Sequence, residues 1–196
     1  MINEILHHFP QEITSEAVKM HGHLAPGIIV GFKLALRALK ELQPEKEDVI
    51  ILTSETTRCI PDGLQSLGRY LLLNGGYHVY HRTYDIGKLA IQVTKNHKDL
   101  FRIILNEDYV KKNATLNAWV NLGNPCKLPA KEITDALWNI DLEKGLLKKP
   151  FMKRVKAGLT GKEAVDCPGC GERTTRLTMV LQDGIYLCKT CAFFQK

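Results

Sequence analysis

The chemistry most visible in the sequence lies in four cysteines of its last thirty residues. They form two Cys-x-x-Cys pairs, Cys167 with Cys170 and Cys188 with Cys191, separated by 17 residues. Within each pair, one tight turn aims two thiolates at the same ion, and backbone N–H groups stabilise their charge. The pattern predicts a structural zinc site with four cysteine ligands and no open position for a substrate. Disulfide bonds and a rubredoxin-like iron site are the alternatives.

The residues between the two pairs predict a small β-hairpin. Arg176 to Gln182 and Ile185 to Leu187 have strand character and flank the turn sequence Asp183-Gly184. This hairpin would bring the second cysteine pair beside the first and complete a zinc ribbon, which we place at residues 156–196. So small a unit buries too little surface to fold unaided, so metal binding would supply roughly 10–16 kcal/mol of folding free energy.

The surface of the ribbon is a candidate contact for nucleic acid or for another protein. Of the net charge of +6, four charges fall in residues 151–196. The same segment holds basic and aromatic side chains suited to phosphate contacts and base stacking, namely Arg173, Arg176, Lys189, Lys196, Tyr186, Phe193 and Phe194. Four thiolates on one zinc ion would offset part of this charge, and the segment has no basic run. Both kinds of partner therefore stay open.

A second group of metal-binding side chains lies in the N-terminal part of the chain. His21 and His23 flank a glycine on a short loop, so both imidazoles can reach one ion. Cys59 follows a predicted strand and precedes a predicted helix, and the helix N-terminus and the neighbouring Arg58 favour its thiolate. The alternative is that the histidines are solvated or hydrogen-bonded and that Cys59 is a small buried apolar residue.

The helices and strands that the sequence predicts around these residues indicate an α+β core over residues 1–155, with helices packed on a mainly antiparallel sheet. Helical spacing and capping signals predict helices at 11–20, 26–42, 61–74, 107–120 and 130–142, the first with Thr14 or Ser15 as its N-cap. Short apolar or alternating runs predict strands at 49–53, 77–83, 88–94 and 101–105. A turn at Tyr84–Gly87 is expected to join the second and third strands as a hairpin.

The composition fits a globular protein that does not enter a membrane. Of 196 residues, 44% are hydrophobic and 24% are charged, close to the globular average. The longest apolar stretches, such as Tyr70–Leu73, fall far short of the ~20 residues that a membrane-spanning helix needs. The first eight residues lack the basic start and apolar core of a secretory signal. We therefore expect a cytoplasmic protein whose cysteines are reduced.

Three segments of the chain resemble one known family, the FmdE family, which takes its name from a component of formylmethanofuran dehydrogenase. His21 to Gly27 resembles its His-Gly-His-x-Cys-Pro-Gly signature, Glu55 to Gln65 resembles its second motif, and Asp85 to Lys88 resembles its Asp-x-Gly-Lys turn. The resemblance runs from about Glu16 to Leu105, and some relatives also carry a C-terminal four-cysteine zinc finger. It implies an α+β core, a homodimer with intertwined subunits, and a metal site around the His-Gly-His loop and Cys59.

The sequence departs from the family pattern at two cysteines. Ala25 stands where the signature has a cysteine, and residues 67–76 lack the Thr-Gly-Cys that the family often shows. Both changes remove thiolates suited to soft-metal or thiol redox chemistry. We therefore expect a degenerate core site of His21, His23 and Cys59 that is one protein ligand short and can hold a water or a small ligand.

These features favour a metal-binding accessory or sensory protein related to molybdenum- or tungsten-dependent one-carbon metabolism. One alternative is a regulatory protein that binds nucleic acid or protein through the ribbon. Another is a metal-dependent enzyme of one-carbon metabolism, with Glu55 or Asp62 acting as the base toward a metal-bound water. The sixth cysteine, Cys126, fits none of these sites and is expected to be a structural or exposed thiol.

Overall fold

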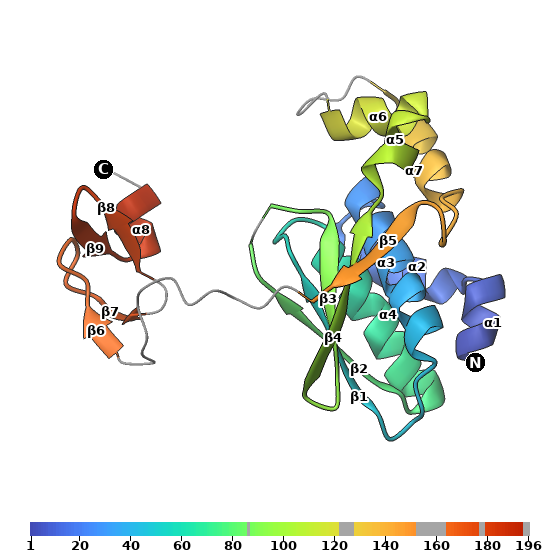
Figure 1. The fold of residues 1–196 in the computed structure, drawn as a ribbon, viewed down its shortest axis with the longest axis horizontal. Coiled ribbons are helices and arrows are strands. Elements are labelled where there is room, and N and C mark those ends of the chain that lie inside the picture. The colour runs from blue at the N-terminus through green and yellow to red at the C-terminus, as the bar shows by residue number, and fades with distance from the viewer. Residues whose placement is uncertain (86, 122–127, 152–163, 177–178, 194–196) are drawn as a thin grey trace. The chain divides into compact units, whose positions relative to one another are not determined.

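The computed structural model describes residues 1–85, 87–121, 128–151, 164–176 and 179–193. The chain divides into two compact units, Met1–Met152 and Lys153–Lys196 (Figure 1). The predicted boundary between residues 155 and 156 lies outside the described residues, and so does Cys126. Within the described part of the chain, no helix has the length and apolar character needed to cross a membrane.

Two long helices form the centre of the helical layer. Helix α3 spans Pro26–Leu42 and helix α4 spans Ile60–Gly75, and each has a proline in its first turn, as the sequence predicts. They pack backbone to backbone at two glycines. An added Cβ would lie 2.6 Å from a backbone oxygen of α4 at Gly31 and 2.5 Å from a backbone oxygen of α3 at Gly63. Only glycine permits this approach, which brings the first turns of the two helices together.

The other helices of the first unit are short. They are α1 (Ile2–His7), α2 (Gln11–His21), α5 (Glu107–Lys111), α6 (Ala114–Asn121) and α7 (Ala130–Trp138). The predicted N-cap of α2 is wrong, because Pro10 occupies that position without a side-chain cap. The predicted helix over 107–120 is broken into two, because Asn113 accepts a hydrogen bond from the N–H of Leu116 and so starts a new helix.

The sheet has five strands in the order β2-β1-β3-β4-β5. Only the β1–β2 pair is parallel, and the other neighbours are antiparallel. The predicted α+β class with a mainly antiparallel sheet is therefore confirmed. The strands are β1 (Val49–Ser54), β2 (His78–Thr83), β3 (Ala90–Lys95), β4 (Lys98–Leu105) and β5 (Leu146–Pro150).

The predicted hairpin at Tyr84–Gly87 is wrong. Strands β2 and β3 do not pair, because β1 lies between them and pairs with both. The hairpin of this sheet joins β3 and β4 instead, through Asn96 and His97 with φ of 50° and 64°. Strand β5 was not predicted. It pairs with β4 at the edge of the sheet, where Pro150 is tolerated although it lacks an N–H, because no further strand requires a donor there.

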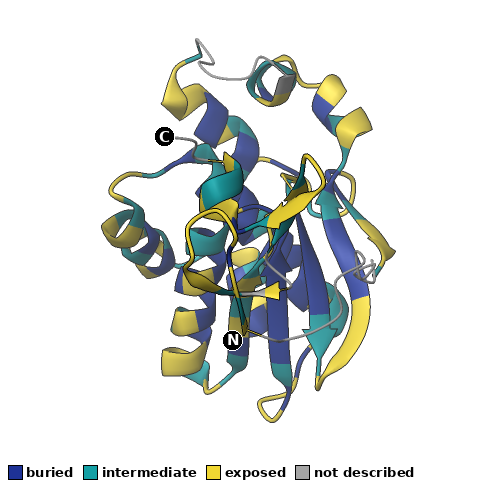
Figure 2. Ribbon diagram, turned by 90° about the vertical axis from the view of Figure 1, so that its left-hand side faces the viewer, coloured by how far each residue is buried: buried dark blue, intermediate teal, exposed yellow. Residues whose placement is uncertain are grey.

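The core of the first unit lies between the helices and one face of the sheet (Figures 1 and 2). Its fully buried side chains include Phe32 and Leu39 of α3, Leu67 of α4, Val93 of β3 and Ile103 of β4. Figure 2 shows this burial continuing along the central strands, with exposed residues gathered at loops and outer helix faces. The packed layer gives the functional loops at the helix ends a rigid support.

The second unit contains two small β-pairs and a short helix. The predicted hairpin around Asp183-Gly184 is confirmed: β8 (Val180–Gln182) pairs with β9 (Ile185–Leu187), and both turn residues have positive φ. The first strand of this hairpin begins at Val180, and residues 177–178 of the predicted strand lie outside the described residues. The other pair, β6 (Ala164–Asp166) with β7 (Arg173–Thr175), and helix α8 (Lys189–Phe193) were not predicted.

Candidate metal centres

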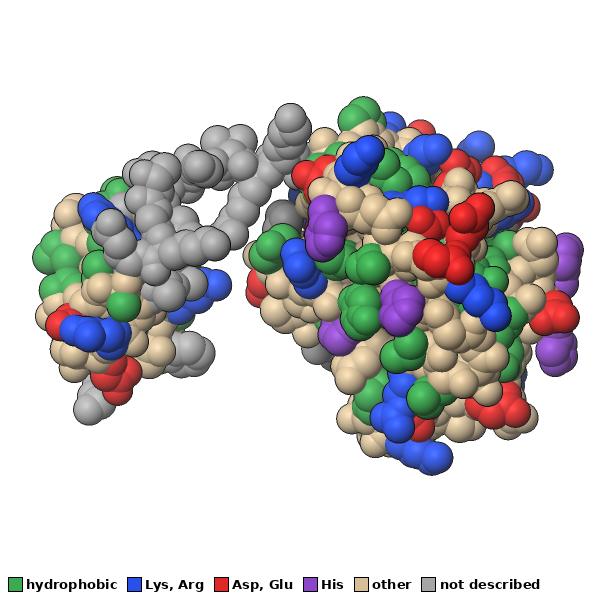
Figure 3. All heavy atoms as spheres, turned by 90° about the horizontal axis from the view of Figure 1, so that it is seen from below, with side chains coloured by type: hydrophobic (Ala, Val, Ile, Leu, Met, Phe, Trp, Pro, Cys, Tyr) green, Lys and Arg blue, Asp and Glu red, His purple; other side chains and the backbone are tan. Residues whose placement is uncertain are grey.

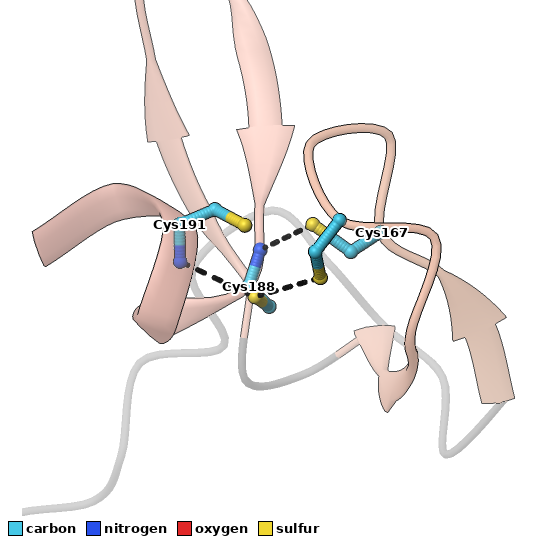
Figure 4. Close-up of side chains that lie close together, drawn as sticks. Cys167, Cys188 and Cys191 are labelled. Atoms are coloured by element: carbon cyan, nitrogen blue, oxygen red, sulfur yellow. Dashed lines mark hydrogen bonds between the residues drawn. The ribbon is translucent and has the colours of Figure 1, made fainter. Parts of the chain in front are cut away.

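The four cysteine side chains of the second unit meet at one point. Their sulfur atoms all lie within 4.8 Å of one another, and those of Cys170 and Cys188 are 3.8 Å apart. A tetrahedral site with Zn–S distances near ~2.3 Å requires sulfur–sulfur separations of about 3.8 Å, whereas a disulfide requires ~2.05 Å. Figure 4 shows Cys167, Cys188 and Cys191 directed toward one another. The spacing therefore fits a shared ion.

Two turns deliver these sulfurs from different parts of the unit. Cys167 follows β6, in a turn that the N–H of Gly171 closes by donating to the Cys167 carbonyl at 2.7 Å. Cys188 follows β9, and Cys191 lies in α8. The N–H groups of Cys188 and Gly169 donate to the sulfur of Cys167 at 3.2 and 3.4 Å, and that of Cys191 donates to the sulfur of Cys188 at 3.4 Å. These bonds stabilise thiolates.

The thiols of this cluster differ in how readily they ionise. The backbone N–H of Cys188, helped by those of Cys170 and Gly169, lowers the pKa of Cys167 to about 6. Hydrogen bonding to Cys170 and Cys188, together with burial, raises the pKa of Cys191 to about 12. Cys167 is therefore ionised at neutral pH, whereas an entering cation must displace the proton of Cys191. The donor set fits zinc, which binds thiolates in a closed tetrahedral site.

The His-Gly-His loop follows α2. His21 is the last residue of that helix, and Gly22 ends it in the left-handed conformation with φ of 92°. Nδ1 of His21 lies 2.6 Å from Oδ2 of Asp62, in the first turn of α4, and the rings of His21 and His23 have centroids 4.9 Å apart. The carboxylate fixes the orientation of His21 and leaves its Nε2 for an ion, as in many metal-binding histidines.

Cys59 lies at the start of α4, three residues before Asp62, as the N-cap of that helix. Gly27, in the first turn of α3, packs against it so closely that an added Cβ would lie 2.9 Å from the Cβ of Cys59 and 3.5 Å from its sulfur. Ala25 is the buried N-cap of α3. The structure thus brings Gly27, at the start of α3, against Cys59, at the start of α4.

Among the described residues, only the four cysteines form a group of three or more His, Cys, Asp or Glu side chains close enough to hold an ion. His21 and His23 lie near each other, but they do not form such a group with Cys59. The described part of the first unit therefore contains two neighbouring histidines, of which Asp62 orients His21, without an assembled three-ligand centre. Sequence reasoning had considered Asp62 only as a base and missed this orienting contact.

The other candidate base, Glu55, is held in a buried ion pair. Arg102 donates from Nε and Nη2 to the two carboxylate oxygens at 2.5 Å each, and Gln92 donates to Oε1 at 3.0 Å. All three side chains are buried. Both oxygens of Glu55 are thus occupied within the sheet. No local signal predicts this pair, because Arg102 lies 47 residues further along the chain.

Among the described residues of the ribbon, the predicted nucleic-acid contacts are not all free basic groups. Arg173 donates to Asp166 at 3.0 Å across the β6–β7 pair, which offsets its charge. Tyr186 and Phe193 are 39% and 64% exposed. Figure 3 shows basic side chains interspersed with acidic and apolar ones on the face that it presents. Of the other predicted contacts, Arg176 and Lys189 are exposed. Phe194 and Lys196 lie outside the described residues.

Comparison with known proteins assigns the first unit to a family. Residues 20–148, more than half of the chain, match the family described as FmdE, molybdenum formylmethanofuran dehydrogenase operon. The chain belongs to the FmdE family. The matched range contains His21, His23, Cys59 and Asp62 and ends before the four cysteines, so the cysteine unit lies outside the family domain. No curated protein matches the chain significantly.

A solved structure shares the fold of this FmdE chain. It is the crystal structure of a tungsten formylmethanofuran dehydrogenase FmdE-like protein from Syntrophus aciditrophicus, with a TM-score of 0.54 and 20% sequence identity. The alignment covers 93% of this chain and 91% of the other. That coverage extends beyond the first unit of this chain.

Proposed function

We propose that this FmdE chain is a cytoplasmic, metal-binding accessory or sensory protein in which a structural zinc ion holds the second unit together. The observation that carries the proposal is the four-sulfur cluster, whose spacing matches a tetrahedral ion. Four cysteine ligands fill every position of such an ion, so its role is to stabilise the unit. A reducing cytoplasm would keep the four thiols available.

We propose in addition that the histidine loop is a degenerate second site for a metal ion or a small ligand. The support is the contact of His21 with Asp62 and the closeness of the two imidazole rings. In this site His21 and His23 bind the ion and Asp62 holds His21 in place. Cys59, which forms no such group with the two histidines in this structure, would join them once an ion is bound. Zinc bound there would supply a Lewis acid with a position that a water or metabolite can occupy. Occupancy that follows metal or metabolite supply would suit an accessory or sensory protein.

Metal analysis of anaerobically purified protein, followed by zinc titration, tests both sites. We expect one tightly bound zinc per chain and a second, weaker equivalent that is lost in His23→Ala and kept in His97→Ala, which removes a histidine at the β3–β4 turn. Loss of the tight zinc in Cys188→Ser would assign it to the ribbon. A zinc-free protein with an ordered second unit would contradict the first site, and a single equivalent throughout the titration would contradict the second.

We further propose that the protein is a homodimer with intertwined subunits, as the family resemblance implies. The support from this chain is apolar surface on the first unit, where Leu73 is 70% exposed and Leu72 is 39% exposed near the end of α4. An intertwined interface usually exceeds ~2,000 Å² and leaves no stable monomer. Sedimentation equilibrium at micromolar concentration should give twice the 22.1 kDa chain mass. A monomer mass would contradict the dimer.

A regulatory role through the ribbon is the second candidate function. It is favoured by an exposed apolar pair on the β8–β9 hairpin, where Leu181 and Tyr186 lie opposite each other and are 56% and 39% exposed. Binding of single-stranded nucleic acid that weakens steeply with salt would support a nucleic-acid partner. Absence of such salt-dependent binding would leave a protein as the partner of the hairpin. The enzyme alternative has less support, because the ion pair with Arg102 occupies Glu55.

A further inference from the structure

A cavity of about 420 Å³ opens at the end of the sheet where β4 passes into α5. Its lining comes from residues 87–89, from the last residues of β4, from α5 and from Val120 of α6. None of these residues belongs to either candidate metal centre. The volume lies within the ~300–1,000 Å³ that small-molecule sites typically have.

The walls of the cavity are apolar and fixed to the sheet. Leu105 and Val110 are buried, and Leu89 is half-buried. The N–H of Leu105 donates to the carbonyl of Leu89 at 3.2 Å, and the N–H of Lys88 donates to the carbonyl of Glu55 at 3.1 Å. The segment that forms one wall is therefore held by hydrogen bonds on two sides. A ligand would meet a pre-formed apolar surface, which lowers the entropy cost of binding.

The charged side chains of the lining give the cavity a net positive charge. Lys88 and Lys111 supply two ammonium groups and Glu107 supplies one carboxylate. Lys111 approaches Asp108 only at 3.9 Å, between two exposed side chains, and such pairs contribute little. Within the described part of the chain, Lys88 makes no ion pair at or below 4.0 Å. A positive charge beside apolar walls suits a ligand that combines an apolar body with one negative group.

We propose that this cavity binds a small amphipathic organic anion. Its acidic group would lie at Lys88 and Lys111, and its apolar body would lie against Leu105 and Val110. The proposal does not depend on either metal site.

Displacement of a fluorescent probe tests this proposal on the full-length, zinc-loaded protein. The probe is 8-anilinonaphthalene-1-sulfonate, with octanoate, octanol and octylamine as competitors of equal chain length and different charge. We expect octanoate to displace the probe at the lowest concentration and octylamine at the highest. Lys88→Gln should weaken octanoate binding about threefold, as expected for one exposed charge pair. Val120→Trp should weaken it about tenfold, because the indole fills apolar volume.

Lys112→Gln is the matched control, because Lys112 directly follows α5 but does not line the cavity. It should leave octanoate binding unchanged. Equal weakening by Lys88→Gln and Lys112→Gln would show general charge attraction and overturn the proposal. So would displacement by octylamine as effective as that by octanoate. Circular dichroism checks the folding of Val120→Trp. If Val120→Trp is destabilised, Lys88→Gln, which changes an exposed side chain, still tests the proposal.

Discussion

Asp62 is the residue on which the proposed histidine site depends most. Its carboxylate lies 2.6 Å from Nδ1 of His21 and so sets which ring nitrogen can face an ion. Removal of such an orienting partner typically costs 10- to 100-fold in metal affinity. We therefore expect Asp62→Ala to weaken second-site zinc binding by about that factor, measured by titration of protein whose ribbon is already zinc-loaded. Asp108→Ala, at an exposed carboxylate, should have no effect, and equal affinities for all three proteins would contradict the role of Asp62.

Ala25 tests whether the second site lacks one thiolate. It is buried beside the start of α3, next to the Gly27 that packs on Cys59. Ala25→Cys should raise second-site zinc affinity, because a soft ligand is restored to the loop. Ala35→Cys, at a buried position further along the same helix, controls for an added thiol. If Ala25→Cys binds zinc no better than the wild type, the loop packs without acting as a metal site.

The pKa values of Cys167 and Cys191 predict how zinc binding by the ribbon changes with pH. Cys167, with a pKa of about 6, is ionised at pH 7.5, whereas Cys191, with a pKa of about 12, is protonated. When the pH falls to 5.5, Cys167 also carries a proton that zinc must displace. Proton release per zinc should therefore rise, by at most one proton from Cys167, as the pH falls from 7.5 to 5.5, and zinc affinity should fall. A pH indicator in weak buffer measures the release, and release that is constant over this range would contradict the assignment.

At the scale of the elements, local signals predicted the helices better than the strand pairing. Pro26 predicted the start of α3, and Gly76, in the left-handed conformation, closes α4 as expected. The pairing of β1 with both β2 and β3 depends on contacts between residues far apart in the chain, which no turn signal encodes. The candidate sites show the same difference between local signals and contacts between distant residues. The cysteine pairs were recognisable by spacing, whereas the Asp62 contact, which spans 41 residues, was not.

The close contact between α3 and α4 predicts that Gly63 cannot be replaced by a larger residue without loss of stability. Gly63→Ala would place a methyl group 2.5 Å from a backbone oxygen of α3. Overpacking costs about 1–3 kcal/mol, and because the methyl group would meet backbone here, we expect a cost in the upper part of that range, above the ~1 kcal/mol gained in helix propensity. We expect the variant to lose about 1–2 kcal/mol in chemical denaturation followed by circular dichroism. Gln65→Ala, at an exposed position of the same helix, should change stability by less than about 0.5 kcal/mol, and a Gly63→Ala protein as stable as the wild type would rule out a tight contact.

At the scale of the whole molecule, the chain joins two units with different sources of stability. The first contains a contiguous buried core between helices and sheet. In the second, Cys167 and Cys188 are the buried residues that the structure describes, and Leu181, Ile185 and Phe193 are exposed. We expect a unit of this size with so little buried apolar surface to need the proposed zinc ion for folding. Loss of the metal should therefore affect the two units differently.

Chelation should unfold the second unit while the first stays folded. We expect limited proteolysis to leave the whole chain intact with zinc bound, and to degrade Lys153–Lys196 once a chelator has removed the metal, leaving a resistant fragment close to Met1–Met152. Cys188→Ser should show the chelated pattern without chelator, because a hydroxyl replaces one thiolate. Asp62→Ala, which alters only the histidine loop, should keep the zinc-bound pattern. A chelated chain as resistant as the zinc-bound one would show that the second unit folds without metal, and simultaneous loss of both units would show that their stabilities are coupled.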